Sequence, residues 1–264
     1  MVADKDAGGH MDLSFGRILI VLLAGFGSGV VNTLAGGGSF LTLAALDLTG
    51  LPVATANGTN RLAVLIGDIL AALGFRSKGL SSFRLSLNFA IPALFGAILG
   101  AYVIIDVPDV FFRRFLGVAM LVMLAILIIN PKKWLEGRDV ELTPARRALA
   151  YLVFFVVGIY GGAIQAGVGF LWITALVLMA GVDLVVANMH KVFIIGVYTL
   201  FALLTFALRG HVHWWLGLVL SAGYSVGAWL TSRAAVERGQ GFVRLVLAVA
   251  LVVLSIRYLG LMQF

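Results

Sequence analysis

Long apolar runs, separated by short polar stretches, follow one another along nearly the whole chain. Ten such runs form two sets of five, and the second run of each set is too short for an ordinary spanning helix. They cover residues 17–35, 39–48, 54–75, 85–105 and 110–130 in the first set, and 147–165, 169–180, 184–208, 214–232 and 242–261 in the second. This pattern predicts an all-α polytopic membrane protein with short or broken helices near the midplane.

The two sets also match each other in sequence. GFGSGVVNTLAGGGSF at 25–40 aligns loosely with GIYGGAIQAGVGF at 158–170, and ANGTNR at 56–61 aligns with ANMHK at 187–191. A repeat of half the chain is typical of secondary transporters, whose halves are often inverted in the membrane. We therefore predict a first transmembrane repeat over 1–130, a cytoplasmic linker over 131–146 and a second transmembrane repeat over 147–264.

The positions of Lys and Arg predict the orientation, because short cytoplasmic loops are rich in these residues. Three such loops are found, at 76–84, 132–147 and 233–244. Suppose that these loops lie in the cytoplasm, and that the first two runs of each set enter the membrane and return to the same side. Each half then crosses the membrane an odd number of times, so the two halves have opposite orientations in the membrane. Arg113 and Arg114, at the outer end of the fifth run, argue against this orientation.

Composition supports the membrane assignment and narrows the chemistry. Of 264 residues, 61% are hydrophobic and only 12% are charged, against about 25% in soluble domains. The net charge of +7 fits basic cytoplasmic loops, so the bilayer is an expected partner and nucleic acid is not. The chain has no cysteine, which excludes disulfides and thiolate metal sites. It carries no phosphate-binding loop, HExxH or GxSxG motif, so we expect neither an enzyme nor a cofactor or metal.

The stretch NTLAGGGSF at 32–40 is the main candidate for a functional site. Non-helical backbone at membrane depth must be buried in protein or face a water-filled cavity, and a helix broken there presents free N–H groups and a positive dipole end. Two such breaks, with Arg61 and Lys191 nearby, predict a site for a small anion. The candidate binding residues are Asn32, Thr33, Gly37, Gly38, Asn57, Asn60, Arg61, Gln165, Asn188, His190 and Lys191. The alternative is that the helices start later and both cations lie in the membrane interface.

Other polar and glycine positions receive simpler interpretations. Asp68 follows Arg61 by seven residues and so lies on the same helix face, where it either neutralises Arg61 or relays a proton. His211 and His213 have no third ligand nearby and are not expected to bind a metal. The GxxxG pairs at 25–29, 96–100 and 158–162 are expected to allow close helix packing.

At these residues the chain resembles the sulfite exporter TauE/SafE family of bacterial membrane transporters. The resemblance rests on GxxxGxxNTxAGGGSFLT at 25–42 and ANGTNRLA at 56–63, followed by GxYGGxxxAGxGF at 158–170, ANMHK and RGHVHW, and it covers essentially the whole chain. It implies a multi-pass protein of the bacterial inner membrane that exports sulfite or a related organosulfur anion such as sulfoacetate. The second half has Gln165-Ala166 where the first has Asn32-Thr33, so identical binding loops are not implied.

We therefore expect a secondary transporter for a small sulfur oxyanion that works by alternating access. An anion channel using the same site, and a transporter of a different small anion, are the alternatives. The sequence leaves open the coupling ion and the oligomeric state, and a homo-oligomer is compatible with it.

Overall fold

The structure, a computed structural model, describes residues 14–80, 84–108, 111 and 143–258. The described parts are helical, with helices α1 (Phe15–Leu34), α2 (Ser39–Asp47), α3 (Val53–Ser77), α4 (Arg84–Ile105), α6 (Pro144–Ala163), α7 (Val168–Ala180), α8 (Leu184–Leu208) and α9 (Trp214–Tyr258). The predicted all-α class is thus confirmed. By length and composition, α1, α3, α4, α6 and α8 could each cross a membrane. Residues 112–142, which hold most of the fifth predicted run and of the predicted linker, lie outside the described part.

Helix boundaries depart from prediction at two places. Helix α6 begins at Pro144, inside the predicted linker, because Pro144 occupies the first helical turn and the Thr143 hydroxyl accepts from the Arg146 N–H. Helix α9 consists of two helices joined across a kink at Gly239, which has φ 70°. The separate runs predicted at 214–232 and 242–261 are thus found, but the first helix continues beyond residue 232 to the kink. The charged stretch around Glu237 is therefore helical rather than a loop.

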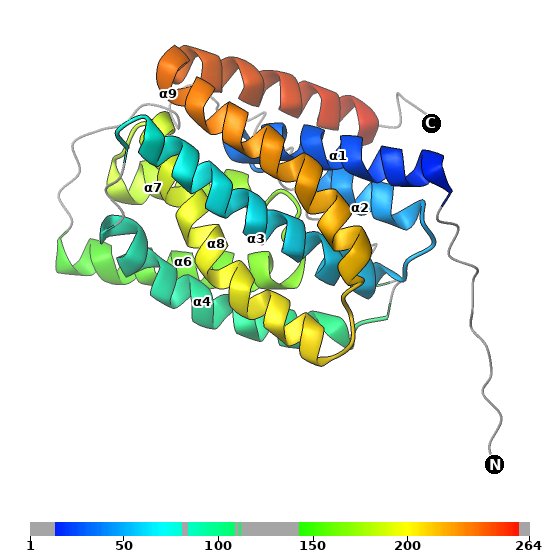
Figure 1. Cartoon of the computed structure of the whole chain (residues 1–264). Helices are drawn as coiled ribbons and strands as arrows, with labels where there is room; N and C mark the ends of the chain where they lie inside the picture. Colours follow the sequence, from blue (N-terminus) through cyan, green and yellow to red (C-terminus); the bar gives the residue numbers. More distant parts are fainter. Residues whose placement is uncertain (1–13, 81–83, 109–110, 112–142, 259–264) are drawn as a thin grey trace.

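Glycines bring two pairs of helices into backbone contact, as the GxxxG spacing predicted. In the first pair the main chain of α9 packs on Gly25 and Gly29 of α1, and in the second the main chain of α6 packs on Gly96 and Gly100 of α4. Figure 1 shows α1 beside α9 and α4 beside α6. Any side chain at these glycines would meet backbone atoms of the neighbouring helix. Each of these small-residue contacts therefore joins a helix of the first half of the chain to a helix of the second half.

The order of contacts along each pair gives the helix directions. Gly25 faces Leu220, and Gly29 faces Ala228, so α1 and α9 are parallel. Matching contacts make α4 parallel to α6 and α3 parallel to α9. In contrast, α3 and α8 are antiparallel, because Gly58 lies against Phe206 whereas Asp68 faces Gly196. These two helices cross at the centre of the bundle (Figure 1).

The described parts of the basic loops lie at one end of the bundle. There the Lys78 ammonium group pairs with Glu237 at 2.5 Å, which ties the end of α3 to α9. At the opposite end Arg209 pairs with Asp106 at 3.6 Å, joining the ends of α8 and α4. This separation agrees with the orientation predicted from Lys and Arg, and the cytoplasmic assignment of the basic end stays a prediction.

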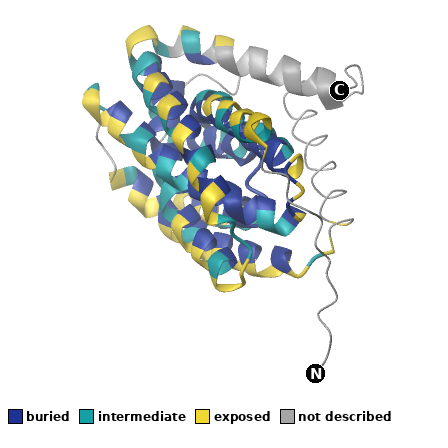
Figure 2. Ribbon diagram, turned by 45° about the vertical axis from the view of Figure 1, so that its right-hand side comes forward, coloured by how far each residue is buried: buried dark blue, intermediate teal, exposed yellow. Residues whose placement is uncertain are grey.

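The short helices α2 and α7 do not cross the bundle. Helix α2 returns from the end of α1 toward the start of α3, and α7 returns from the end of α6 to the basic end, where the Arg146 guanidinium donates to the Leu178 carbonyl at 2.7 Å. Apolar side chains line the outside of the bundle, and buried residues fill its interior (Figure 2). The two breaks, at 35–38 and 164–167, lie in this buried interior.

Candidate functional site

The first helix break touches the start of α7, just after the second break, in the buried interior of the protein. Gly36, which has φ 77°, lies so close to Gly169 at the start of α7 that a Cβ on either residue would collide with the Cα of the other. The Gly169 N–H also donates to the Gly36 carbonyl at 3.3 Å. Only glycine combines this backbone conformation with this approach. The first break is therefore held against the first turn of α7, which belongs to the other half of the chain.

All eleven predicted binding residues are buried, and none faces the outside of the bundle. Arg61 and Lys191 are both 0% exposed, although each lies well inside a long helix. The alternative assumed that these helices start later, which is wrong, because α3 starts at Val53 and α8 at Leu184. A buried cation requires hydrogen-bond acceptors, and both have found them in the opposite half of the chain.

Arg61, on α3, binds the last turn of α6. Its guanidinium donates to the main-chain oxygens of Gly161 at 3.2 Å, of Gly162, and of Ala163 at 3.3 Å. The amide of Asn57 donates to the Ala163 oxygen as well, at 2.7 Å. The last carbonyls of a helix have no partner inside the helix and carry its negative dipole end, which favours a cation there.

Lys191, on α8, makes the corresponding contacts to the last turn of α1. Its ammonium group donates to the main-chain oxygens of Asn32 at 2.7 Å and Thr33 at 2.8 Å, and to the side-chain oxygen of Asn188 at 2.7 Å. Three acceptors use all three of its N–H donors. Each cation thus closes the C-terminal end of the broken helix that belongs to the other half.

The remaining predicted residues have separate partners. The Asn32 amide donates to the Tyr224 hydroxyl at 2.5 Å, and the Gln165 amide donates to the Thr199 hydroxyl at 3.0 Å. His190 pairs through Nδ1 with the Ser86 hydroxyl of α4, at 2.6 Å, rather than with a residue of either break. The hydroxyl of Thr33 donates to the carbonyl of Gly29 in its own helix.

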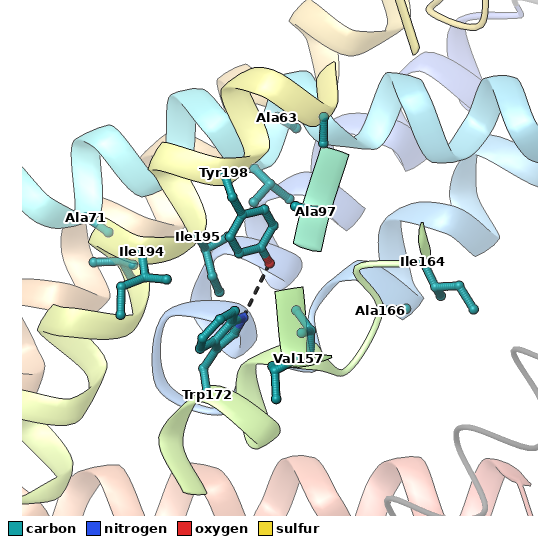
Figure 3. Close-up of a cluster of buried hydrophobic side chains, with 14 of the residues drawn as sticks. Ala63, Ala71, Ala97, Val157, Ile164, Ala166, Trp172, Ile194, Ile195 and Tyr198 are labelled. Carbon is teal, nitrogen blue, oxygen red and sulfur yellow. Dashed lines mark hydrogen bonds between the residues drawn. The ribbon is translucent and has the colours of Figure 1, made fainter. Parts of the chain in front are cut away.

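Sequence reasoning missed Thr42 and the aromatic wall beside the second break. The Thr42 hydroxyl donates to the Asn60 side-chain oxygen at 2.6 Å, which turns the Asn60 amide nitrogen away from Thr42. Trp172 and Tyr198 pack beside the break between α6 and α7, joined by an N–H···O bond of 3.4 Å (Figure 3). Thr42 could have been noticed because it follows the glycine motif, whereas a single Trp or Tyr in an apolar helix carries no such signal.

Several buried donors around the two breaks have no partner in the described part of the chain. At the first break they are the hydroxyls of Ser28 and Ser39 and the Asn60 amide nitrogen, and beside the end of α6 there is Nε of Arg61. No side chain caps the first turn of α2 or of α7. Unpartnered buried donors at a helix N-terminus are suited to the oxygen atoms of an anion, since each would gain a charge-assisted hydrogen bond.

Comparison with known proteins places the chain among membrane transporters. The family model described as "Sulfite exporter TauE/SafE" matches residues 21–258. The chain is 27% identical over 249 residues to a probable membrane transporter protein, ORF9, of Sinorhizobium sp, covering 94% of this chain and 95% of that protein. It is 30% identical over 244 residues to the probable membrane transporter protein YfcA of Escherichia coli (strain K12), covering 91% and 87%. No solved structure matches it.

Proposed function

The chain belongs to the sulfite exporter TauE/SafE family, and we propose that it is a secondary transporter that exports sulfite or a related small organosulfur anion. Its curated relatives are named as probable membrane transporters, which supports transport as the activity. The choice of sulfite follows the description of the family. We place the protein in the bacterial inner membrane, with the basic end of the bundle in the cytoplasm.

The observation that carries this proposal is the contact between the two helix breaks. No side chain caps the N-terminal end of α2 or of α7, and the segment before α2 meets the first turn of α7 at Gly36 and Gly169, where the positive ends of the helix dipoles favour a negative charge. Ser39 and Asn60 add neutral donors that lack partners among the described residues. A sulfur oxyanion presents several oxygen acceptors on one small centre and could engage all of these groups at once.

In this proposal the two cations act in different ways. Arg61 keeps one N–H donor, at Nε, for direct contact with the anion, while its other nitrogens hold the end of α6. The donors of Lys191 are all engaged, so its charge stabilises the anion from a distance. Because the interior has a low dielectric constant, a charge that makes no direct contact still contributes.

Alternating access is supported by the helix directions. Helices α1 and α3 run one way, and their counterparts in the second half, α6 and α8, run the other way. Inverted halves of this kind could exchange conformations around a central site, so that the site opens first to one side and then to the other. Gly36 and Gly169, where the halves touch, would then lie at the contact that has to rearrange.

Transport by purified protein in proteoliposomes tests the proposal. We expect saturable uptake of labelled sulfite, and accelerated exchange when unlabelled sulfite is present on the opposite side. Flux that grows linearly with concentration and shows no exchange would instead identify a channel. If sulfite gives no flux, the same assay with sulfoacetate and thiosulfate separates a wrong substrate from a wrong activity.

Asn60→Asp tests the site itself. This change keeps the shape and the acceptor for Thr42 but replaces the free donor with negative charge, so we expect sulfite binding to be lost. Asn88→Asp is the matched control, because Asn88 is exposed on α4 and its variant should bind sulfite normally. Normal sulfite affinity in a folded Asn60→Asp variant would show that the anion binds elsewhere.

A further inference from the structure

Asp68 carries a buried carboxyl group that has no role in binding an anion. It lies in the interior of α3, is 1% exposed, and neither of its oxygens has a hydrogen-bond partner in the described ranges. It forms no direct ion pair with Arg61 or Lys191. An ionised carboxylate in such a place would be strongly unfavourable, so we expect the carboxyl to be protonated in this conformation.

The groups that face Asp68 come from several helices. On its own helix, Arg61 lies two turns earlier and is engaged with the end of α6. From α8, Lys191 and Tyr198 interact with it electrostatically, and Gly196 leaves the space beside its Cβ open. From α9, Tyr224 packs on the adjacent Gly67.

The other two helices packed against α3 bring no charge to the buried interior beside Asp68. Helix α1 contributes the neutral Asn32, which donates to the Tyr224 hydroxyl. The titratable residue of α1 is Arg17, near its first turn, and that of α2 is Asp47, which is exposed at its last turn. Lys191 is therefore the cation best placed to compensate a charge on Asp68.

We propose that Asp68 binds and releases the proton that is exchanged during transport, with Lys191 as the partner that compensates its charge. This proposal rests on the transport function above and adds a coupling ion to it. In the protonated state Asp68 is neutral and Lys191 holds the last turn of α1. When Asp68 releases its proton to water, the O–H bond breaks and a carboxylate remains. The Lys191 ammonium group then exchanges its bonds to Asn32 and Thr33 for a bond to that carboxylate.

This exchange connects proton release to the broken helix. The carbonyls of Asn32 and Thr33 lose a cationic partner when Lys191 moves, so the end of α1 is freed. Helix α1 leads directly into the break at Gly36, which touches the first turn of α7 at Gly169. A change of one proton at Asp68 can therefore alter the contact between the two halves.

Infrared spectroscopy on purified protein tests the proton site without any substrate. We expect the C=O band of a buried protonated carboxyl group that weakens as the pH rises and is missing in Asp68→Asn. Since the wild-type titration needs no variant, it stays informative if a variant folds poorly. A spectrum with no band that depends on Asp68 would overturn the proposal, whatever the transported anion.

Proteoliposomes then test the coupling. In Asp68→Asn, accumulation driven by a pH gradient should be lost while sulfite binding is retained, and Asp68→Glu should restore part of that accumulation. Asp106→Asn, which changes an exposed carboxylate, should behave as wild type. Proton-driven accumulation that persists in Asp68→Asn would show that Asp68 does not couple. If wild-type protein moves no anion, the transport function fails while the infrared result still decides the proton site.

Discussion

The ammonium group of Lys191 lies 2.7 Å from the main-chain oxygen of Asn32, so a cation of the second half closes the end of a broken helix in the first half. Arg61 makes the reciprocal contact to the end of α6. These two positive charges meet the two negative dipole ends created by the breaks. The broken helix in each half of the chain is therefore stabilised by a cation from the other half.

Lys191→Met should destabilise the protein by about 1–3 kcal/mol, because buried carbonyls at the end of α1 lose their partner. The change can be measured as a lower melting temperature in detergent. Lys78→Met is the control, since Lys78 forms a partly exposed pair with Glu237 that should contribute only about 0–1 kcal/mol. Equal melting temperatures for both variants would contradict the structural role of Lys191.

Gly36→Ala should be more damaging than Gly50→Ala. Both glycines have positive φ, 77° and 83°, so alanine costs about 1–2 kcal/mol of backbone strain at either position. At Gly36 the new Cβ would also collide with Gly169, whereas no atom lies within 4 Å of the Cβ position at Gly50. The difference between the melting temperatures of the two variants measures the loss of stability caused by the collision with Gly169. Equal melting temperatures would mean that Gly36 and Gly169 are not in close contact.

Gly29→Ala should weaken the packing of α1 on α9, because its Cβ would meet the backbone of Tyr224. Gly27→Ala, on the same helix, would make only an ordinary contact of 3.6 Å with Leu41. It should be neutral, or stabilising by up to about 1 kcal/mol through the better helix propensity of alanine. Thermal unfolding of the two variants compares them directly. Opposite signs are expected, and destabilisation by Gly27→Ala alone would contradict the packing described here.

Ser39→Ala separates a binding role from a structural one. The hydroxyl of Ser39 is buried without a partner among the described residues, so its removal should leave stability unchanged or slightly higher. Sulfite affinity should nevertheless fall by about tenfold or more, as expected for a lost hydrogen bond of about 1.5–3 kcal/mol to a charged group. Ser225→Ala, at another unpartnered hydroxyl, should leave affinity unchanged. Calorimetric titration of sulfite measures both, and unchanged affinity in Ser39→Ala would remove Ser39 from the site.

The hydrophobic pattern alone was sufficient to predict the described helices, including the short α2 and α7. The length of an apolar run shows whether a helix is long enough to cross the membrane, and glycines show where a helix ends. Both features depend only on neighbouring residues in the sequence. The same local signals identified the two breaks, and all eleven residues chosen with them are buried, although His190 contacts neither break. They failed at the start of α6 and in the middle of α9, where a cap and a charged helical turn extend the helix beyond its apolar run.

Which polar groups meet was decided by the tertiary fold. Arg61 and Gly161 are 100 residues apart, and Lys191 and Asn32 are 159 apart, so no local rule could have paired them. Proximity to a glycine break predicted that both cations would hold an anion, whereas the fold places them on helix C-termini. The hydroxyls of Ser28 and Ser39, the Asn60 amide nitrogen and Nε of Arg61 are left without partners among the described residues. A buried cation needs hydrogen-bond acceptors, and the acceptors available to it are those of the helix that packs beside it in the tertiary structure.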